Sequence, residues 1–329
     1  MKPKILVTRE VFDDVLDYLR QYFEVTANQE DLLFDPETLG QRLADKDGAM
    51  TCLTEKIDAA LLGRCPELKA VCNIAVGYNN IDIAACTARG IMVTNTPGVL
   101  DGSTADFTWA LILATARRLT EAEAYLRAGK WERWQLKQFL GADVHQATIG
   151  IYGMGRIGRA VARRAAGFEM SVIYHNRNRA APEIEAQCHA RYVSRDELLA
   201  QADFLVLQVP YSPQTHHLIG ATELKKMKRS AILINVARGG VVDDTALIEA
   251  LESGAIAAAG LDVFENEPRL HPGFLRLRNV VLSPHIASSS EATRHGMAML
   301  AANNLVAALT SGNPPNLLNP EAKGVMGKG

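Results

Sequence analysis

Two series of short apolar segments alternate with helix-like segments along the 329-residue chain. The first series has strand-like segments at residues 4–8, 48–53, 68–77 and 90–96. Residues 11–23 carry apolar side chains at spacings of three and four, which is typical of an amphipathic helix. The second series has strand-like segments at residues 148–153, 170–175, 190–193, 203–210, 231–237, 257–264 and 279–286. Strands that alternate with helices predict a parallel α/β fold.

Two longer helical patterns flank the second series. Residues 103–127 form one helical stretch whose first part is apolar on most of its surface, which predicts burial between domains or subunits. Residues 290–312 form the last helical stretch. We therefore expect two Rossmann-like or flavodoxin-like parallel-sheet domains with a cleft between them. One domain, 101–286, would be inserted into the other, which comprises 1–100 and 287–329.

Composition excludes several classes of protein. The chain is 48% hydrophobic and its formal net charge is −2, so it lacks the basic surface of a nucleic-acid or membrane-surface binder. No apolar run approaches the 18 residues of a membrane span. The five cysteines show no C-x-x-C spacing, and the N-terminus lacks a signal-peptide pattern. These features predict free thiols in a reducing compartment, and we expect the cytoplasm.

The sequence G-M-G-R-I-G places glycines at 153, 155 and 158, directly after an apolar strand and at the start of a helical pattern. In a dinucleotide-binding turn, Gly153 would permit the tight turn and Gly155 would let the backbone approach pyrophosphate. Gly158 would allow close packing of helix on strand. The alternative is a glycine-rich turn in an unrelated βα unit. The strand–turn–helix context favours the dinucleotide site and makes 101–286 the nucleotide domain.

The segment after the next strand lacks the acidic residue that usually binds the adenosine ribose about 20 positions beyond the glycines. His175 and Asn176 occupy this place, and Arg177 and Arg179 follow. A carboxylate would repel a 2′-phosphate, whereas an arginine offers it a planar set of donors. This pattern favours NADP(H), with NAD(H) also accepted. The alternative is a solvated basic loop beside an NAD site.

Polar residues follow three later strands of the second series. Arg238 follows one, Asp262 and Glu267 the next, and His285 and Ser288 the last. Because parallel strands present their carboxyl ends at one edge, these side chains can converge there. Arg238 can bind a carboxylate or polarise a carbonyl, and His285 can donate a proton near neutral pH.

Glu267, if bonded to His285, would favour the imidazolium and orient the ring. This set suits the reduction of a 2-oxo acid, in which hydride reaches C2 and His285 protonates the oxygen. Each residue also has a structural alternative: Arg238 as a helix cap, Glu267 as a solvated charge and His285 as a loop histidine.

The sequence resembles the D-isomer-specific 2-hydroxyacid dehydrogenase family along nearly its whole length. The segments that carry the resemblance are AVGYNNID, GIMVTNTPGVL, TADFTWALILATARRL, GIYGMGRIG, RSAILINVARGGVVDDTALIEAL, AAAGLDVFENEP and SPHIASSSEATRHGM. Arg238, Glu267 and His285 match the family's Arg–Glu–His set. Asn79 stands where the family commonly has Asp. The segments TPGVLDGSTADFTWALILATARR, PYSPQTHHLIG and ASSSEATRHGMAMLAANNL are closest to the glyoxylate/hydroxypyruvate reductase branch, which includes 2-ketogluconate reductases.

The resemblance implies further roles. The Val76 and Gly77 amides would hold the substrate carboxylate, together with Arg238 and His285, and Leu53 and Ser288 would shape the pocket. Thr104 and Asp262 would contact the nicotinamide end of the cofactor. The remaining cofactor contacts that the resemblance implies are Met154, Arg156, Ile157, Val209, Pro210, Thr215, Val236 and Ala237.

The expected function is NADPH-dependent reduction of glyoxylate, hydroxypyruvate or 2-ketogluconate to D-2-hydroxy acids. The alternatives are an NAD-dependent dehydrogenase of another substrate, such as phosphoglycerate or D-lactate, and a nucleotide-sensing co-repressor-like protein. Formate dehydrogenase is disfavoured because that relative typically has Gln in place of Glu267.

Two further expectations concern partners and metals. The resemblance implies a homodimer in which the aromatic segment containing Trp131, Trp134 and Phe139 crosses to the neighbour; Trp134 or Phe139 would then line the neighbour's pocket. The alternative for these aromatics is packing within one subunit. His216 and His217 are adjacent and have no Cys or Asp cluster near them in sequence, so we expect a loop role and no metal.

Overall fold

The computed structural model describes residues 1–324, and the chain divides into two compact units. Unit 1 comprises residues 1–100 together with the described chain from Ser290 onward, and unit 2 comprises Asp101–Ser289. The return to unit 1 lies three residues beyond the expected boundary of 286/287. Ala287 packs into the core of unit 2, whereas Ser290 caps the N-terminus of helix α12 (Glu291–Thr310).

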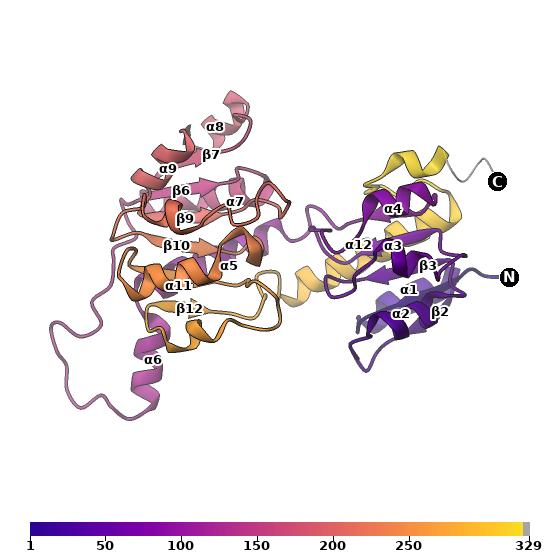
Figure 1. Cartoon of the computed structure of the whole chain (residues 1–329), viewed down its shortest axis with the longest axis horizontal. Helices are drawn as coiled ribbons and strands as arrows, with labels where there is room; N and C mark the ends of the chain where they lie inside the picture. The colour runs from indigo at the N-terminus through magenta and orange to yellow at the C-terminus, as the bar shows by residue number, and fades with distance from the viewer. Residues whose placement is uncertain (325–329) are drawn as a thin grey trace. The chain divides into compact units, whose positions relative to one another are not determined.

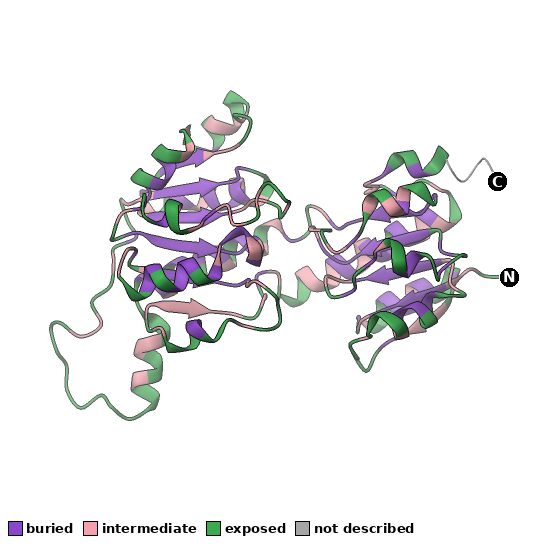
Figure 2. Ribbon diagram, viewed as in Figure 1, coloured by how far each residue is buried: buried purple, intermediate pink, exposed green. Residues whose placement is uncertain are grey.

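Unit 1 is built on a five-stranded parallel sheet with strand order β2-β1-β3-β4-β5, the flavodoxin-like order. Its strands are β1 Lys4–Val7, β2 Glu24–Ala27, β3 Gly48–Thr51, β4 Ala70–Asn73 and β5 Met92–Thr94. Its helices are α1 Asp13–Tyr22, α2 Pro36–Leu43, α3 Ala59–Leu62, α4 Ile83–Ala88, α12 and the 3₁₀ helix η4 Pro320–Gly324. The inner strands β3 and β4 are fully buried, as a covered parallel sheet requires (Figure 2).

Strand β2 was not predicted from the sequence. It lies at the edge of the sheet, pairs only with β1 and has no buried residue. Its sequence, EVTA, therefore carries no apolar run, because an edge strand does not need two covered faces. Backbone pairing with β1, from Lys4–Glu24 to Val7–Ala27, holds it in place.

Unit 2 is built on a seven-stranded parallel sheet with order β12-β11-β10-β9-β6-β7-β8. The strands are β6 Thr148–Tyr152, β7 Ser171–His175, β8 Ala190–Tyr192, β9 Phe204–Leu207, β10 Ile232–Asn235, β11 Ala258–Leu261 and β12 Val280–Leu282. All seven expected strands of the second series are thus confirmed. The order reverses between β6 and β9, which is the switch point where doubly wound sheets bind dinucleotides.

The helices of unit 2 lie around this sheet, except that α6 (Leu119–Arg127) extends away from it (Figure 1). They are α5 Asp101–Ala116, α6 Leu119–Arg127, α7 Arg156–Ala165, α8 Pro182–Cys188, α9 Arg195–Gln201, α10 Ala221–Leu224 and α11 Asp244–Glu252. Three short 3₁₀ helices are η1 Ala166–Phe168, η2 Gly239–Val241 and η3 Pro272–Arg276. Apolar α5 packs on β10, β11 and α7, as its hydrophobic surface predicts.

The prediction of a single helix over 103–127 is wrong, because helix α5 ends at Ala116 and α6 begins at Leu119. Arg118 adopts a left-handed backbone with φ of 53°, and the Ala116 carbonyl accepts from the Ala142 N–H. The hydrogen bond from Ala142 thus takes the place of the one that a further helical turn would make to the Ala116 carbonyl. Helix α6 and the arm, which we define as residues 128–140, extend away from the sheet of unit 2 (Figure 1). Among residues 1–324, no helix is long and apolar enough to cross a membrane.

Candidate active site

The glycine turn follows β6 at the switch point of unit 2. Gly153 has a φ of +109°, and a Cβ there would lie 2.6 Å from the Gln208 carbonyl oxygen. A Cβ on Gly158 would lie 2.2 Å from the Gly153 carbonyl oxygen, so this position requires glycine for close packing of α7. Gly155, in contrast, faces open space at the N-terminus of α7. The turn therefore leaves room for a phosphate beside the α7 amides.

Asn176 fixes this turn from the next strand. Its side-chain oxygen accepts a 2.7 Å hydrogen bond from the Met154 N–H. His175 is held by its neighbours, since Nδ1 lies 2.9 Å from the Val193 carbonyl and the ring stacks on Tyr192. These two residues occupy the expected place of the ribose-binding acid, and neither carries a carboxylate. The absence of negative charge is compatible with a 2′-phosphate.

The two arginines of this loop differ in their contacts. Arg179 forms two 2.8 Å hydrogen bonds with Glu185, which also accepts from the Tyr174 hydroxyl at 2.6 Å. These hydrogen bonds lower the pKa of Glu185 to about 2. Arg177 makes no ion pair or hydrogen bond with any residue in 1–324. Its guanidinium is therefore the one of the two that is available to a phosphate.

The loop after β10 carries Arg238. Asn235 anchors the loop, because its side chain accepts from the Ala237 N–H at 3.1 Å and donates to the Arg238 carbonyl at 3.0 Å. The Arg238 guanidinium donates to the Ala237 carbonyl at 2.7 Å. Burial lowers the pKa of Arg238, and the nearby charge of Glu267 opposes this effect. The charge of Glu267 thus acts on Arg238, in the direction that the predicted Arg–Glu–His set requires.

The structure brings His285 and Glu267 together. Nδ1 of His285 lies 2.8 Å from Oε2 of Glu267, and Oε1 of Glu267 accepts from the Phe264 N–H at 2.8 Å. Burial raises the pKa of Glu267, but the hydrogen bond and charge of His285 outweigh it and leave this pKa lowered. The side chains are 29% and 33% exposed, so Nε2 of an oriented histidine can reach a substrate.

Asp262 holds the His285 loop. Its carboxylate accepts from the Ser283 hydroxyl and the Ile286 N–H at Oδ1 and from the Ala287 N–H at Oδ2, at 2.7–2.8 Å. The Asp262 carbonyl also accepts from the His285 N–H at 2.8 Å. The residue is 0% exposed, so the side chain makes its contacts with this loop. Burial raises the pKa of Asp262, and the donated hydrogen bonds oppose this effect.

In unit 1, the backbone around Val76 and Gly77 is fixed through its carbonyl groups. The Val76 carbonyl accepts from the Asn95 side chain at 2.8 Å, and the Gly77 carbonyl accepts from Asn73 at 3.0 Å. Neither the Val76 nor the Gly77 N–H bonds to another described residue. Two oriented and unpaired amides are suited to binding a carboxylate.

Leu53 lies in the same unit on a loop that a buried glutamate anchors. Glu55 accepts from the Cys52 N–H at 2.7 Å and from the Thr8 hydroxyl at 2.9 Å. Asn80 donates to the Cys52 and Glu55 carbonyls. Sequence reasoning missed these anchors, and also Asn73, Asn95 and Asn235. A polar residue that ends an apolar strand, as in AVCN and ILIN, is the signal that could have indicated Asn73 and Asn235.

The other expected site residues all lie in unit 2. Arg156 pairs with Asp101 at 3.3 Å, and the Thr215 hydroxyl bonds to the Pro210 carbonyl at 2.7 Å. Six more of the expected residues are buried or half-buried and follow strands or lie near the starts of helices. They are Thr104, Ile157, Val209, Val236, Ala237 and Ser288. In the arm, Phe139 packs on Tyr125 of its own chain, whereas Trp134 is 74% exposed.

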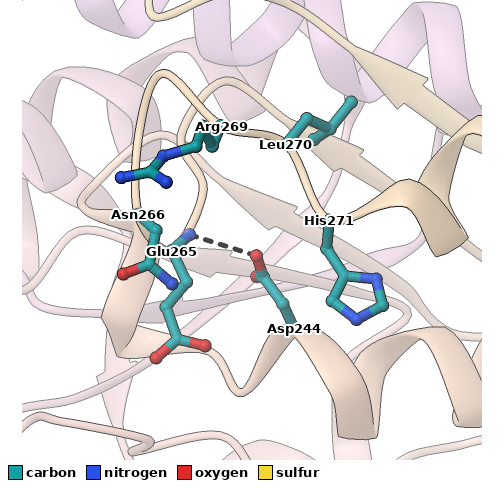
Figure 3. Close-up of a pocket in the computed structure, with 6 residues that line it drawn as sticks. All are labelled: Asp244, Glu265, Asn266, Arg269, Leu270 and His271. Carbon is teal, nitrogen blue, oxygen red and sulfur yellow. Dashed lines mark hydrogen bonds between the residues drawn. The ribbon is translucent and has the colours of Figure 1, made fainter.

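A pocket beside the catalytic loop is lined by Asp244, Glu265, Asn266, Arg269, Leu270 and His271 (Figure 3). The Asp244 carboxylate accepts from the Glu265 N–H at 3.1 Å and so supports the loop that carries Glu267. Asp244 is 4% exposed. Burial raises its pKa to about 6, although the Glu265 hydrogen bond opposes this effect.

Comparison with known proteins agrees with this geometry. Residues 109–287 match the family model "D-isomer specific 2-hydroxyacid dehydrogenase, NAD binding domain". A glyoxylate reductase of Thermococcus gammatolerans is 49% identical over 98% of this chain and 97% of its own length.

Two solved structures share the fold. An NADPH-dependent glyoxylate/hydroxypyruvate reductase from Sinorhizobium meliloti, in complex with NADP and malonate, has a TM-score of 0.88 and 35% identity, covering 98% of both chains. A 2-hydroxyacid dehydrogenase from Ketogulonicigenium vulgare has a TM-score of 0.82 and 33% identity over 97% of this chain and 99% of that one.

The parallel nucleotide domain and its Arg–Glu–His edge are thus those of a nicotinamide-dependent oxidoreductase. The chain belongs to the D-isomer specific 2-hydroxyacid dehydrogenase family. The expected family and enzyme class are confirmed.

The buried Asp244 makes stability depend on pH. Its pKa of about 6 lies above the ordinary value of 3.8, so ionisation of the carboxyl destabilises the folded state as pH rises through this interval. We expect Asp244→Asn to raise Tm by on the order of 5 °C near neutral pH and to have little effect near pH 4. Calorimetry at the two pH values measures this. Exposed Asp196→Asn is the control, and an equal effect of Asp244→Asn at both pH values contradicts the prediction.

Proposed function

We propose that the protein reduces small 2-oxo acids to D-2-hydroxy acids with NADPH. Glyoxylate and hydroxypyruvate are the proposed substrates, and 2-ketogluconate is a further candidate. The observation that carries the proposal is the 2.8 Å His285–Glu267 pair beside Arg238. This set supplies a proton donor, a carboxylate that orients it and a cation for a 2-oxo acid. Relatives named as glyoxylate reductases support the substrate class.

The glycine turn fits a dinucleotide. Gly155 leaves open space at the start of α7, and the Gly153 and Gly158 positions exclude any larger residue. The residues proposed to hold the cofactor include Gly153–Gly158, His175–Arg177 and Thr215, and Arg179 would contribute only after loosening its pair with Glu185. When bound, the reduced nicotinamide supplies a hydride to the substrate's C2.

The chain's own residues would supply binding, orientation and the proton. In unit 2, Arg238 binds the carboxylate of the substrate, and in unit 1 the N–H groups of Val76 and Gly77 are suited to the same group. His285 donates its Nε2 proton to the C2 oxygen as the carbonyl becomes an alcohol. Glu267 stabilises the imidazolium before that transfer. Asp262 is a positioning residue, because it holds the backbone of the His285 loop.

The preference for NADPH is proposed to depend on Arg177. The loop after β7 has no carboxylate at His175 or Asn176, and Arg177 has no partner within residues 1–324. An unpaired guanidinium can donate two hydrogen bonds to a 2′-phosphate. The Sinorhizobium relative, solved with NADP, supports this assignment by similarity.

We also propose that the protein forms a homodimer through its arm, and that it works in the cytoplasm. Four large apolar side chains of the arm are exposed, namely Trp131, Trp134, Leu136 and Leu140. Because large exposed apolar patches are rare on monomers, these side chains support a contact with a second copy. All five cysteines are free thiols, which supports a reducing compartment.

Loss of the catalytic set tests the mechanism. We expect His285→Ala and Arg238→Ala to lower kcat/KM for glyoxylate by at least about 10²-fold, because proton donation and carboxylate binding are lost. Glu267→Gln should lower the rate and shift the alkaline limb of the pH–rate profile to lower pH, since no carboxylate then favours the imidazolium. Exposed His145→Ala is the control. Near-native turnover by folded His285→Ala contradicts the mechanism.

Cofactor choice tests the role of Arg177. Initial rates at 340 nm with glyoxylate, hydroxypyruvate and 2-ketogluconate should be higher with NADPH than with NADH at matched concentrations. Arg177→Ala should raise KM for NADPH about tenfold or more, because a charge-assisted hydrogen bond is lost, and leave KM for NADH unchanged. Arg191→Ala, another exposed arginine of this region, is the control. Equal use of both cofactors by the wild type would mean that this loop is exposed to solvent and does not bind the 2′-phosphate.

Oligomeric state tests the arm. Light scattering should give the mass of a dimer, and Trp134→Glu should weaken the dimer by about 30-fold or more, because a buried charge replaces an aromatic contact. Leu275→Glu is the control, since Leu275 is 71% exposed but lies outside the arm. A wild-type monomer, or a dimer that Trp134→Glu leaves intact, contradicts the proposal. Unchanged substrate kinetics in Trp134→Ala and Phe139→Ala would exclude these residues from the neighbour's pocket.

A further inference from the structure

The adjacent histidines of unit 2 point the same way, contrary to the expectation from their spacing. The rings of His216 and His217 stack with centroids 3.9 Å apart and planes at 24°. Glu265, from the loop after β11, contacts this pair, and its Oε1 lies 2.7 Å from Nε2 of His217. One ligand atom from each of the three residues lies within 4.8 Å of the others. Sequence spacing could not indicate this cluster, because Glu265 is distant from both histidines along the chain.

We propose that His216, His217 and Glu265 bind one divalent transition-metal ion of the zinc class. Ligand atoms around tetrahedral zinc lie about 3.3 Å apart, a spacing that falls between the 2.7 Å and 4.8 Å limits of this cluster. The three side chains are thus close enough for one ion, and the stacked rings must turn apart so that a nitrogen of each is directed at it. Two imidazoles and one carboxylate suit zinc, cobalt or nickel, whereas magnesium and calcium prefer oxygen ligands alone.

The second ring nitrogen of His216 already has a hydrogen-bond partner, and that of His217 faces a carboxylate. Nδ1 of His216 lies 3.2 Å from the Tyr211 hydroxyl, and Nδ1 of His217 lies 3.8 Å from Oδ2 of Asp243. Histidines that bind metals usually have the other nitrogen hydrogen-bonded, as that of His216 is here, which orients the ring. The Nε2 atoms are then the nitrogens left for an ion.

The surroundings favour a cation. The Asp243 and Asp244 carboxylates flank the cluster, and Asp244 fixes the backbone of Glu265 through its N–H. Figure 3 shows the Glu265 carboxylate pointing away from the Arg269 guanidinium. Asp244 thus holds the backbone of Glu265, whose carboxylate is turned from the Arg269 guanidinium in that view.

The ion would link two functional loops. His216 and His217 follow directly after Thr215, and Glu265 lies two residues before Glu267. Binding would therefore restrain the loop proposed to contact the cofactor against the loop that carries the proposed catalytic carboxylate. The site itself does not depend on the proposed reaction, because no catalytic residue is a ligand.

Calorimetric titration of the metal-free protein with zinc chloride tests the site. We expect one zinc ion per chain, a cobalt complex with visible absorption bands, and no heat with magnesium. His216→Ala should weaken zinc binding by on the order of 100-fold, because a ligand is lost. Glu265→Gln should weaken it less, since an oxygen ligand remains. His145→Ala, which removes an exposed histidine elsewhere, should bind zinc like the wild type.

Two results would overturn the proposal. One is the absence of zinc binding by the wild type. The other is zinc binding that His216→Ala leaves unchanged, which would assign the ion to the cysteine thiols or to other surface groups. Circular dichroism of each variant confirms that it is folded.

Discussion

The candidate active site depends on one buried carboxylate. Asp262 has no exposed surface, and a charge in that position is stable only because the surrounding groups donate hydrogen bonds to it. The donors are the Ser283 hydroxyl and the backbone of Ile286 and Ala287. Together they hold His285 in a left-handed backbone, with φ of 54°, and direct its ring to Glu267. Asp262, which the resemblance places at the nicotinamide, thus also holds the loop of His285, the proposed proton donor.

The parallel sheet supplies the rest of the geometry. Every strand of unit 2 ends at the same edge, so loops from distant parts of the chain become neighbours there. Asparagine side chains at strand ends bond to the backbone of neighbouring loops. Asn235 fixes the Arg238 loop in unit 2, and Asn73 and Asn95 fix the carbonyls of Gly77 and Val76 in unit 1. A short amide satisfies backbone groups that leave the sheet and so makes an irregular loop rigid.

A charged side chain is available to a ligand only where the fold does not pair it with another residue. Arg177 and Arg179 look equivalent in HNRNR, yet Glu185 binds Arg179 in two places and leaves Arg177 for a phosphate. The same distinction applies to His216 and His217. Their adjacency argued against a metal, whereas their stacking and the approach of Glu265 bring together the ligand set that we propose. Both outcomes depend on partners that lie far away in sequence or on loop conformations.

The sequence by itself determined the parallel α/β class, all the strands of unit 2 and the glycine turn, because buried strands and tight turns require particular residues locally, and it indicated Arg238, Glu267 and His285 as a candidate set. Only the tertiary structure decided the edge strand β2, the break at Arg118, the anchoring role of Asp262 and the pairing of Arg179. These features depend on contacts through space. An edge strand needs only one neighbour, and a carboxylate's role depends on which donors the fold brings to it.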